Sequence, residues 1–258
     1  MLSGPILDNK DPGSPSVFEP AALLREARRQ KGLPLDDVRA VCILDPDGDI
    51  VRRLKNSGQA KLSDRCPVIT PNSTNFRSRV KPPASSAAPW GTFRGLSCRR
   101  AFACGCRMLI NVTAAGQITP AGDPPYFVAI DPTLRDEGTS FRCATPETFA
   151  EGDPRIVEAA VLALTGKGLR VHVGTSWTTD EPFRETQSAI ATARGKGGLA
   201  VEMEAAALCT FARKRDNAVL CLAHVTNTTG LTDQDFETGE ADGTAKALLI
   251  LETLSNAL

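Results

Sequence analysis

The chain contains 258 residues, 41% of them apolar, and is therefore long enough to bury a sizeable core as one large or two small domains. Thirty basic and thirty acidic residues leave a formal net charge of zero, which gives no indication of a nucleic-acid or membrane partner. No apolar run approaches the length of a membrane-spanning helix, and the first residues lack the apolar centre of a signal peptide. We therefore expect a cytoplasmic protein.

Cysteines and histidines, which are common metal ligands, are scattered along the sequence. The eight cysteines lie mostly in apolar surroundings, and we expect them to be reduced core residues. Histidine occurs only as His172 and His224, so we expect no metal site. His172 lies within a predicted strand, where a half-buried strand residue is a simpler interpretation than a catalyst.

The N-terminal part predicts a leader, a helix and a strand. Residues 1–16 are rich in Gly, Pro, Ser and Asp, which favours a flexible leader, with a single domain over 17–258. Residues 19–31 carry an apolar stripe with helical spacing, and residues 38–44 form an apolar run typical of a strand. The acidic run 45–49 lacks the spacing of a calcium-binding loop, so an ordinary acidic turn is the preferred interpretation.

Residues 66–100 differ from the rest of the chain. They contain six Arg or Lys and five Pro but no Asp or Glu, and they predict an irregular segment. Three interpretations are open: a flexible basic insertion, a nucleic-acid arm, or a segment translated out of frame that ends near Ala101. The abrupt change in composition favours the third, whereas a nucleic-acid arm would be expected to carry more aromatic residues. A gene with no frame that yields alternating strands and a Gly-rich turn here would contradict it.

Ordered patterns return after Ala101. Residues 107–112 predict a buried strand, followed by small residues at 113–116 whose amides could approach an anion, or which could form a plain turn. Residues 126–130 predict another strand, with a turn at Asp131-Pro132. Residues 135–140 predict a polar loop, in which Arg135 could belong to a surface ion-pair cluster.

The next segments alternate between helix and strand. Residues 154–166 predict an amphipathic helix, residues 169–174 a strand, and residues 180–194 a helix that begins with Asp180 as its N-cap. Trp177 and Phe183 flank the loop between them. Their rings could stack on a flat heterocycle or fill the core.

Two carboxylates mark the point where a strand becomes a helix. The stretch 197–212 begins as an apolar run after glycine and continues as an alanine-rich helix. Glu202 and Glu204 are two residues apart, so in an extended backbone they point to the same face. Such a pair is costly in a core and useful against sugar hydroxyls. Acids in the first turn of a surface helix would give the same pattern.

The C-terminal part predicts a central strand and a closing helix. Residues 219–225 are apolar, as expected for a strand covered on both faces, and residues 245–258 predict a helix. Asn227 follows the strand. Its amide offers both a donor and an acceptor, and it could also form a local Asx turn.

Four segments, taken in order, resemble motifs of the nucleoside phosphorylase and nucleosidase superfamily. The last of them is similar to the ribose-binding signature on the uridine phosphorylase side. The resemblance runs from about Phe102 to the C-terminus, with a weaker echo over residues 18–55. The four segments are residues 111–116, 135–140, 173–180 and 201–208.

The alternation of strands and helices by itself predicts an α/β protein with helices on both sides of a sheet. The resemblance implies, more narrowly, a three-layer αβα sandwich around a mixed and partly closed sheet. Ligands in α/β folds bind at the carboxyl ends of strands. The candidate segments 113–116, 175–180, 202–204 and 226–228 all follow predicted strands, so we expect them to meet at one edge.

The resemblance implies an enzyme of nucleoside metabolism that transfers the pentose of a nucleoside to phosphate. Phosphate is then a co-substrate, no cofactor is needed, and a homo-oligomer is expected. Asn227 favours a pyrimidine nucleoside such as uridine. The resemblance implies that Glu204 holds the ribose hydroxyls, that Met203 packs on the ribose face, and that Glu202 orients the pair or contacts the base side. It also implies contacts with the base for Asn227, Trp177, Phe183 and Arg135. Contacts with phosphate are implied for Thr113 and Ala114.

The chain departs from the family pattern on the phosphate side. Leu44 replaces the glycine of a Gly-Asp-Pro loop, Asn111 replaces an arginine of some members, and Ala114 replaces a hydroxyl residue. Thr113 could substitute for that hydroxyl only with a backbone shift. Two alternatives are open. The departures favour a hydrolytic nucleosidase of the same fold, and the segment 66–100 could make the chain a catalytically inactive nucleoside-binding relative.

Overall fold

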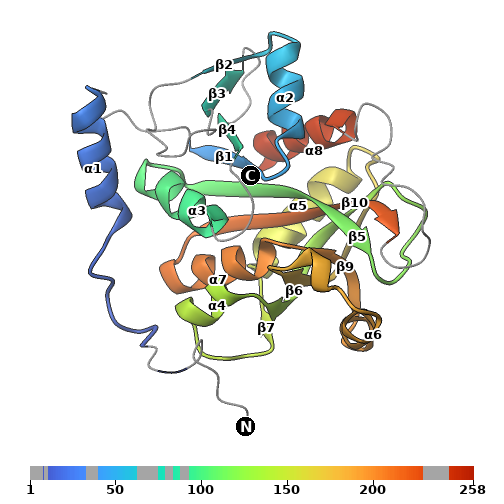
Figure 1. Ribbon diagram of the computed structural model, residues 1–258. Helices are drawn as coiled ribbons and strands as arrows, with labels where there is room; N and C mark the ends of the chain where they lie inside the picture. The colour runs from blue at the N-terminus through green and yellow to red at the C-terminus, as the bar shows by residue number, and fades with distance from the viewer. Residues whose placement is uncertain are drawn as a thin grey trace.

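The computed structural model describes residues 8, 11–32, 40–62, 75–78, 84–87, 93–228 and 244–258. Within these residues, ten strands form one mixed sheet, with helices packed on both of its faces (Figure 1). The strands are β1 (Val41–Asp45), β2 (Ala60–Leu62), β3 (Asn75–Ser78), β4 (Ala84–Ala87), β5 (Met108–Gln117), β6 (Tyr126–Asp136), β7 (Phe149–Ala150), β8 (Val171–Thr179), β9 (Gly198–Glu202) and β10 (Ala218–Thr228).

The sheet closes on itself over half of its strands. Its order is β10-β6-β8-β9-β5-β1-β4-β3-β2, and β10 also pairs with β5. Strands β5, β9, β8, β6 and β10 therefore form a closed ring, and β1, β4, β3 and β2 extend from it as an open arm. β5 runs parallel to both β1 and β10, so the three strands share one carboxyl edge.

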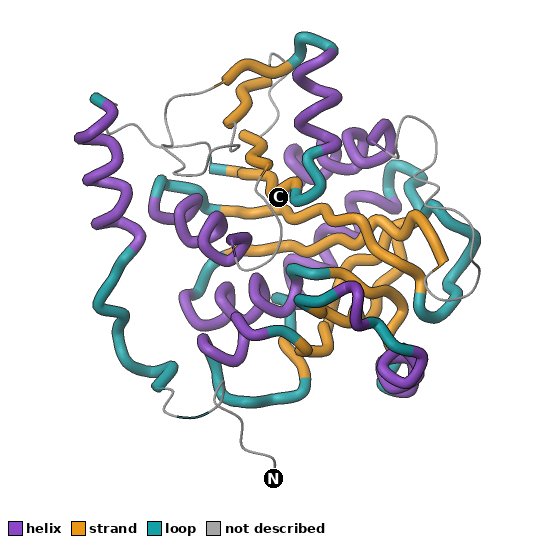
Figure 2. Tube along the Cα trace, in the orientation of Figure 1, coloured by secondary structure: helices purple, strands orange, loops and turns teal. Residues whose placement is uncertain are grey.

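The helices form two outer layers, as Figure 2 shows around the central strands. One core cluster joins the sheet to α3 and α7, and the other joins it to α5 and α8. Alternating side chains of β5 enter the two clusters: Leu109 and Ala115 face the first, and Ile110 and Val112 face the second. The helices are α1 (Pro20–Lys31), α2 (Asp49–Asn56), α3 (Phe93–Ala103), α4 (Gly138–Cys143), α5 (Pro154–Thr165), α6 (Gln187–Gly195), α7 (Ala205–Arg215) and α8 (Thr244–Ala257), with a 3-10 turn at Pro182–Arg184.

This architecture confirms the expected three-layer α/β fold with a mixed, partly closed sheet. The helices expected at 19–31, 154–166 and 245–258 are present within a residue or two. Pro occupies the first turn of both α1 and α5, where the missing amide donor costs nothing. Among the described residues, no helix is long and apolar enough to cross a membrane.

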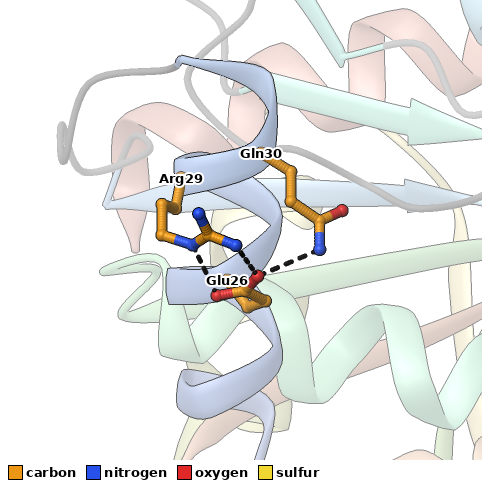
Figure 3. A network of polar contacts seen from close by, with 3 residues as sticks. All are labelled: Glu26, Arg29 and Gln30. Carbon is orange, nitrogen blue, oxygen red and sulfur yellow. Dashed lines mark hydrogen bonds and ion pairs between the residues drawn. The ribbon is translucent and has the colours of Figure 1, made fainter.

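Helix α1 lies at the edge of the molecule and buries Leu24 and Ala27. On its exposed side, Arg29 and Gln30 donate hydrogen bonds to the Glu26 carboxylate (Figure 3). These bonds, the one from Arg29 above all, lower the pKa of Glu26 to about 2. In the leader expected over 1–16, residues 8 and 11–16 are described, and the other positions lie outside the described residues.

Three expected loops are strands instead. β5 continues to Gln117 because residues 114–117 pair with β10, and Gly116 and Gln117 also pair with β9. β6 continues through Pro132, which lies where its register with β8 shifts, and reaches Asp136. β8 likewise extends to Thr179. Ladder partners far away in the chain outweigh the local preference of small and polar residues for loops.

The expected helix over 180–194 is also corrected. A 3-10 turn occupies Pro182–Arg184, and α6 begins later with Thr186 as its N-cap, whose hydroxyl accepts from the Ala189 amide at 3.2 Å. Asp180 is not the cap, because its carboxylate accepts from the Gly138 amide instead.

The segment 66–100, expected to be irregular, contains β3, β4 and the start of α3. At these positions the expectation was wrong. β4 pairs in parallel with β1, so the backbone is held by a neighbouring strand although its sequence shows no apolar alternation. The remaining positions lie outside the described residues, and the reading-frame hypothesis stays a prediction.

Candidate active site

The junction between β9 and α7 carries the two carboxylates. β9 ends at Glu202 and α7 begins at Ala205, which leaves Met203 and Glu204 between them. Glu202 is 3% exposed and Glu204 is 1% exposed, so neither belongs to a solvated surface helix. Met203 is half-buried. The two acids are inside the protein, and they have different hydrogen-bond partners.

Glu204 is joined to β5. Its Oε2 accepts a hydrogen bond from the hydroxyl of Thr113, which is 2% exposed. Its backbone carbonyl accepts the first helical bond of α7, from the Leu208 amide at 3.1 Å. The carboxylate is therefore held at the place where β5 and the start of α7 meet.

Glu202 is held by donors of the protein itself. Its Oε2 accepts from the amides of Glu204 and Ala205, both at 2.7 Å. Its Oε1 accepts from the hydroxyls of β8, at 3.1 Å from Ser176 and also from Thr178. A carboxylate bonded in this way fixes the backbone of its neighbour. Of the two roles expected for Glu202, these bonds support orientation of the pair.

Thr113 and Ala114 line a small cavity at the carboxyl edge of β1, β5 and β10. The acids Asp45, Asp47 and Asp49, between the end of β1 and the start of α2, line the same cavity. Among the described lining residues there is no Lys or Arg. In the part of the chain that the structure describes, no group of three or more His, Cys, Asp and Glu side chains is placed to hold a metal ion.

The backbone amide expected to face phosphate has a partner within the protein. The Ala114 amide donates to the Asp47 carboxylate at 2.8 Å. Asp45, which is 2% exposed, accepts from the Val51 amide at 2.8 Å. Burial, helped by the charges of Asp47 and Asp49, raises the pKa of Asp45 to about 7. The described part of this cavity is therefore acidic.

His224 also lines this cavity and lies opposite Ala114 in the β5–β10 ladder. Its ring stacks on Phe127 with centroids 4.3 Å apart and an angle of 3° between the planes. Burial lowers the pKa of His224 to about 4, so the ring is neutral at pH 7. Its Nε2 is buried with no hydrogen-bond partner among the described residues. One feature of the sequence could have pointed to His224, which is a polar residue inside the apolar run 219–225.

Asn111 is fully buried, two residues before Thr113 on the same face of β5. Neither its amide oxygen nor its amide nitrogen has a hydrogen-bond partner within the described structure. Buried polar groups are nearly always paired, so this amide is a candidate for contact with a ligand. The sequence marked this position only as a departure from the resembled pattern.

The aromatic residues expected at the base do not gather at this cavity. Trp177 is 3% exposed, packs with Ile118 and Ile190 in a core cluster, and donates its indole N–H to Asp136 at 3.0 Å. Of the two roles considered for the Trp177 ring, stacking on a heterocycle or filling the core, this position supports the second. Phe183 is 92% exposed and is not among the residues that line the cavity.

Arg135 is neither in a loop nor in a surface ion-pair cluster. It is buried in β6, where Nε donates to Ser140 at 2.9 Å and Nη1 donates to the Thr145 carbonyl at 2.7 Å. Burial lowers the pKa of this guanidinium. The bonds hold α4 against the sheet. Nη2 is buried with no partner in the described residues, so a contact with the base stays a prediction.

The four segments expected to meet do meet in the described residues. Thr113 bonds to Glu204, and the β8 hydroxyls bond to Glu202. Thr226 lines the cavity with Thr113. The backbone of Asn227 lies opposite Gly116 in the β5–β10 ladder, while its side chain lies outside the described residues.

Comparisons with known proteins agree with this fold. A family model described as the phosphorylase superfamily matches residues 96–255. Curated protein sequences give no match. The purine nucleoside phosphorylase of Toxoplasma gondii, solved with immucillin-H, has a TM-score of 0.74 and 16% identity over 87% of this chain and 93% of that one.

Two further solved structures are similar. The uridine phosphorylase of Vibrio fischeri has a TM-score of 0.69 and 18% identity, over 86% of this chain and 94% of that one. The 5′-methylthioadenosine/S-adenosyl homocysteine nucleosidase of Campylobacter jejuni has a TM-score of 0.66 and 17% identity, over 84% of this chain and 98% of that one. At these identities the similarity establishes the fold alone.

Proposed function

The chain belongs to the phosphorylase superfamily, and we propose that it cleaves the N-glycosidic bond of a nucleoside, with Glu204 as the residue that holds the ribose hydroxyls. One observation carries this proposal. The Glu204 carboxylate is buried at the junction of β5 and α7, where it accepts a hydrogen bond from Thr113. The family match over residues 96–255 contains both of these residues.

The proposed reaction is favoured by a negative charge close to the ribose. As the bond between sugar and base breaks, positive charge develops on the ribose ring. A preorganised carboxylate in a site without bulk water stabilises that charge more strongly than water does. Met203, half-buried beside Glu204, would pack on the ribose face. The Asn227 amide would hold the base, which favours a pyrimidine such as uridine.

The acceptor of the ribose is either phosphate or water. The sequence resemblance implies phosphate, held near Thr113 and Ala114. For phosphate to reach the Ala114 amide, the Asp47 carboxylate has to leave it, and the nearby charge of Asp49 opposes an anion. Water needs no such rearrangement. Hydrolysis is therefore the acceptor reaction that the described cavity favours, and phosphorolysis is the second candidate.

An assay on the full chain separates these reactions. Uridine, inosine and adenosine are each incubated with the protein, with and without inorganic phosphate, and free base and sugar product are measured. Release of base without phosphate identifies a nucleosidase, and release that requires phosphate identifies a phosphorylase. Saturable binding of a nucleoside without release identifies a binding protein and contradicts the proposal. The Glu204→Gln variant, purified in the same way, controls for contaminating enzymes.

Other properties stay predictions. A homo-oligomer and the absence of a cofactor are implied by the resemblance, and a cytoplasmic location is an expectation from composition. Sedimentation of the purified chain tests the first of these.

A further inference from the structure

Three hydroxyl groups lie behind the Glu202 carboxylate, none of them exposed to solvent. Thr133 comes from β6, and Ser176 and Thr178 come from β8, with Thr133 opposite Ser176 in the ladder. The Thr133 oxygen lies 2.8 Å from the Thr178 oxygen and 2.9 Å from the Ser176 oxygen. The sequence showed only that residues 175–179 are rich in hydroxyl groups.

The direction of the hydrogen bonds follows from counting protons. Each hydroxyl has one proton to donate. Thr178 accepts from the Ala206 amide at 3.0 Å and donates to Glu202, so its bond with Thr133 must be one in which Thr133 donates. Ser176 then donates either to Thr133 or to Glu202. Under either arrangement, Thr178 donates to the Glu202 carboxylate, and Thr133 supports it by donating to Thr178.

Glu202, held by these hydroxyls, in turn fixes the backbone of Glu204. Its other oxygen accepts from the Glu204 and Ala205 amides, which are the first amides of the α7 turn. Hydrogen bonds to a carboxylate are short and strong, so the amide positions are well defined. The Glu204 side chain, which reaches Thr113, starts from that fixed backbone.

We infer that Thr133, Ser176 and Thr178 are positioning residues, which act through Glu202 to place the Glu204 carboxylate and so set the preference for a sugar with its 2′-hydroxyl. This inference rests on the proposed role of Glu204 at the ribose. A displacement of about 1 Å at such a group costs about 10²-fold in rate, so a carboxylate held by a rigid network discriminates between sugars better than a mobile one.

The test compares variants that remove a hydroxyl at constant shape. Thr178→Val removes the proton donated to Glu202, Thr178→Ser keeps it, and Ser176→Ala removes a second donor. The matched control is Thr119→Val, because the Thr119 hydroxyl also anchors β9, through the Gly198 carbonyl at 2.7 Å, but has no bond to Glu202. If Thr178→Val folds poorly, Ser176→Ala can be compared with the wild type in its place.

The first readout needs no activity. We expect amide hydrogen exchange at Glu204 and Ala205 to be about tenfold faster in Thr178→Val and Ser176→Ala than in wild type, Thr178→Ser and Thr119→Val. Equal exchange rates in the wild type and in every variant that folds would overturn the inference. This result stands even if the wild-type chain cleaves no nucleoside, an outcome that would instead remove the proposed function.

The second readout uses the nucleoside that the wild type cleaves, paired with its 2′-deoxy analogue. We expect kcat/KM for the ribonucleoside to fall about tenfold to a hundredfold in Thr178→Val, mostly through kcat, and kcat/KM for the deoxynucleoside to change much less. Thr178→Ser is expected to restore the wild-type ratio. An equal loss on both substrates would overturn the assigned effect on sugar preference.

Discussion

Thr113 donates its hydroxyl proton to the carboxylate of Glu204, a residue 91 positions later in the chain, at a point where both side chains are buried. The bond connects a strand of the closed ring to the first turn of α7. Glu202, by contrast, accepts hydrogen bonds from amides and hydroxyls of the protein itself.

Glu204→Gln is expected to lower the rate of base release by about 10²- to 10³-fold, because the amide carries no charge to stabilise the sugar cation. The fold should be retained, since the Gln oxygen can still accept from Thr113. Base-release kinetics and the Tm measure the two effects. Glu158→Gln, an exposed change on α5, is the control and should leave both unchanged. Full turnover in Glu204→Gln would remove this residue from the mechanism.

Asp47→Ala is expected to strengthen the binding of inorganic phosphate by about tenfold, because it frees the Ala114 amide and removes a negative charge from the cavity. Titration calorimetry with phosphate measures this without any nucleoside. Asp49→Ala removes the same charge from the same cavity, but Asp49 pairs with Arg52 and not with that amide, so its effect should be smaller. Identical phosphate affinity in wild type and Asp47→Ala would contradict the assignment.

The Asp45→Asn variant is expected to gain stability relative to the wild type as the pH rises from 5 to 8. The pKa of Asp45 is raised to about 7 in the fold, chiefly by burial. The folded state therefore holds this proton more tightly than the unfolded state, so its contribution to stability falls between about pH 4 and pH 7. The full loss is on the order of 4 kcal/mol, and the Asn variant avoids it.

Urea unfolding of wild type and Asp45→Asn at pH 5 and pH 8 measures this difference. Asp153→Asn is the control. Arg155 lowers the pKa of Asp153, so that carboxyl stays ionised throughout this range and its variant should show a constant difference from wild type. A constant difference for Asp45→Asn as well would contradict the raised pKa.

His224→Phe is expected to reduce the loss of stability on acidification. Burial lowers the pKa of His224 to about 4, so the unfolded chain binds this proton first and the fold loses up to about 3 kcal/mol as the pH falls from 6.5 to 4. Phe keeps the stacking on Phe127 and has no charge to bury. Urea unfolding at pH 6.5 and pH 4 checks this. Parallel pH profiles for variant and wild type would contradict it.

Asn111→Leu is expected to raise the free energy of unfolding by about 1–3 kcal/mol, because it removes two buried polar atoms that have no hydrogen-bond partner within the described residues. Urea unfolding at pH 7 measures the change. Asn217→Leu, outside the core, is the control and should stay within about 0.5 kcal/mol of wild type. A less stable Asn111→Leu protein would show that the amide is paired after all.

Local patterns sufficed for much of the fold. The helix after Glu204 and the strand β10 are readable because an alanine-rich run and a continuous apolar run each lie within one short segment. The meeting of Glu202 with the end of β8 was predictable for a different reason: β8 and β9 are parallel neighbours, which bring their carboxyl ends to one edge. β9 is antiparallel to β5, so that rule did not predict the contact of Glu204 with Thr113.

The tertiary structure alone decided which groups touch. β5 and β6 run past their expected ends because strands far away in the chain pair with them, and Trp177 became a core residue because Ile118 and Ile190 surround it. The Asp47 carboxylate reached the Ala114 amide across 67 positions. Such contacts depend on distances between segments, and the order of residues along one segment carries no information about them. The sequence by itself therefore determined the family, the layers and the pair of acids, whereas the packing determined that Glu204 faces Thr113 and Glu202 holds the backbone.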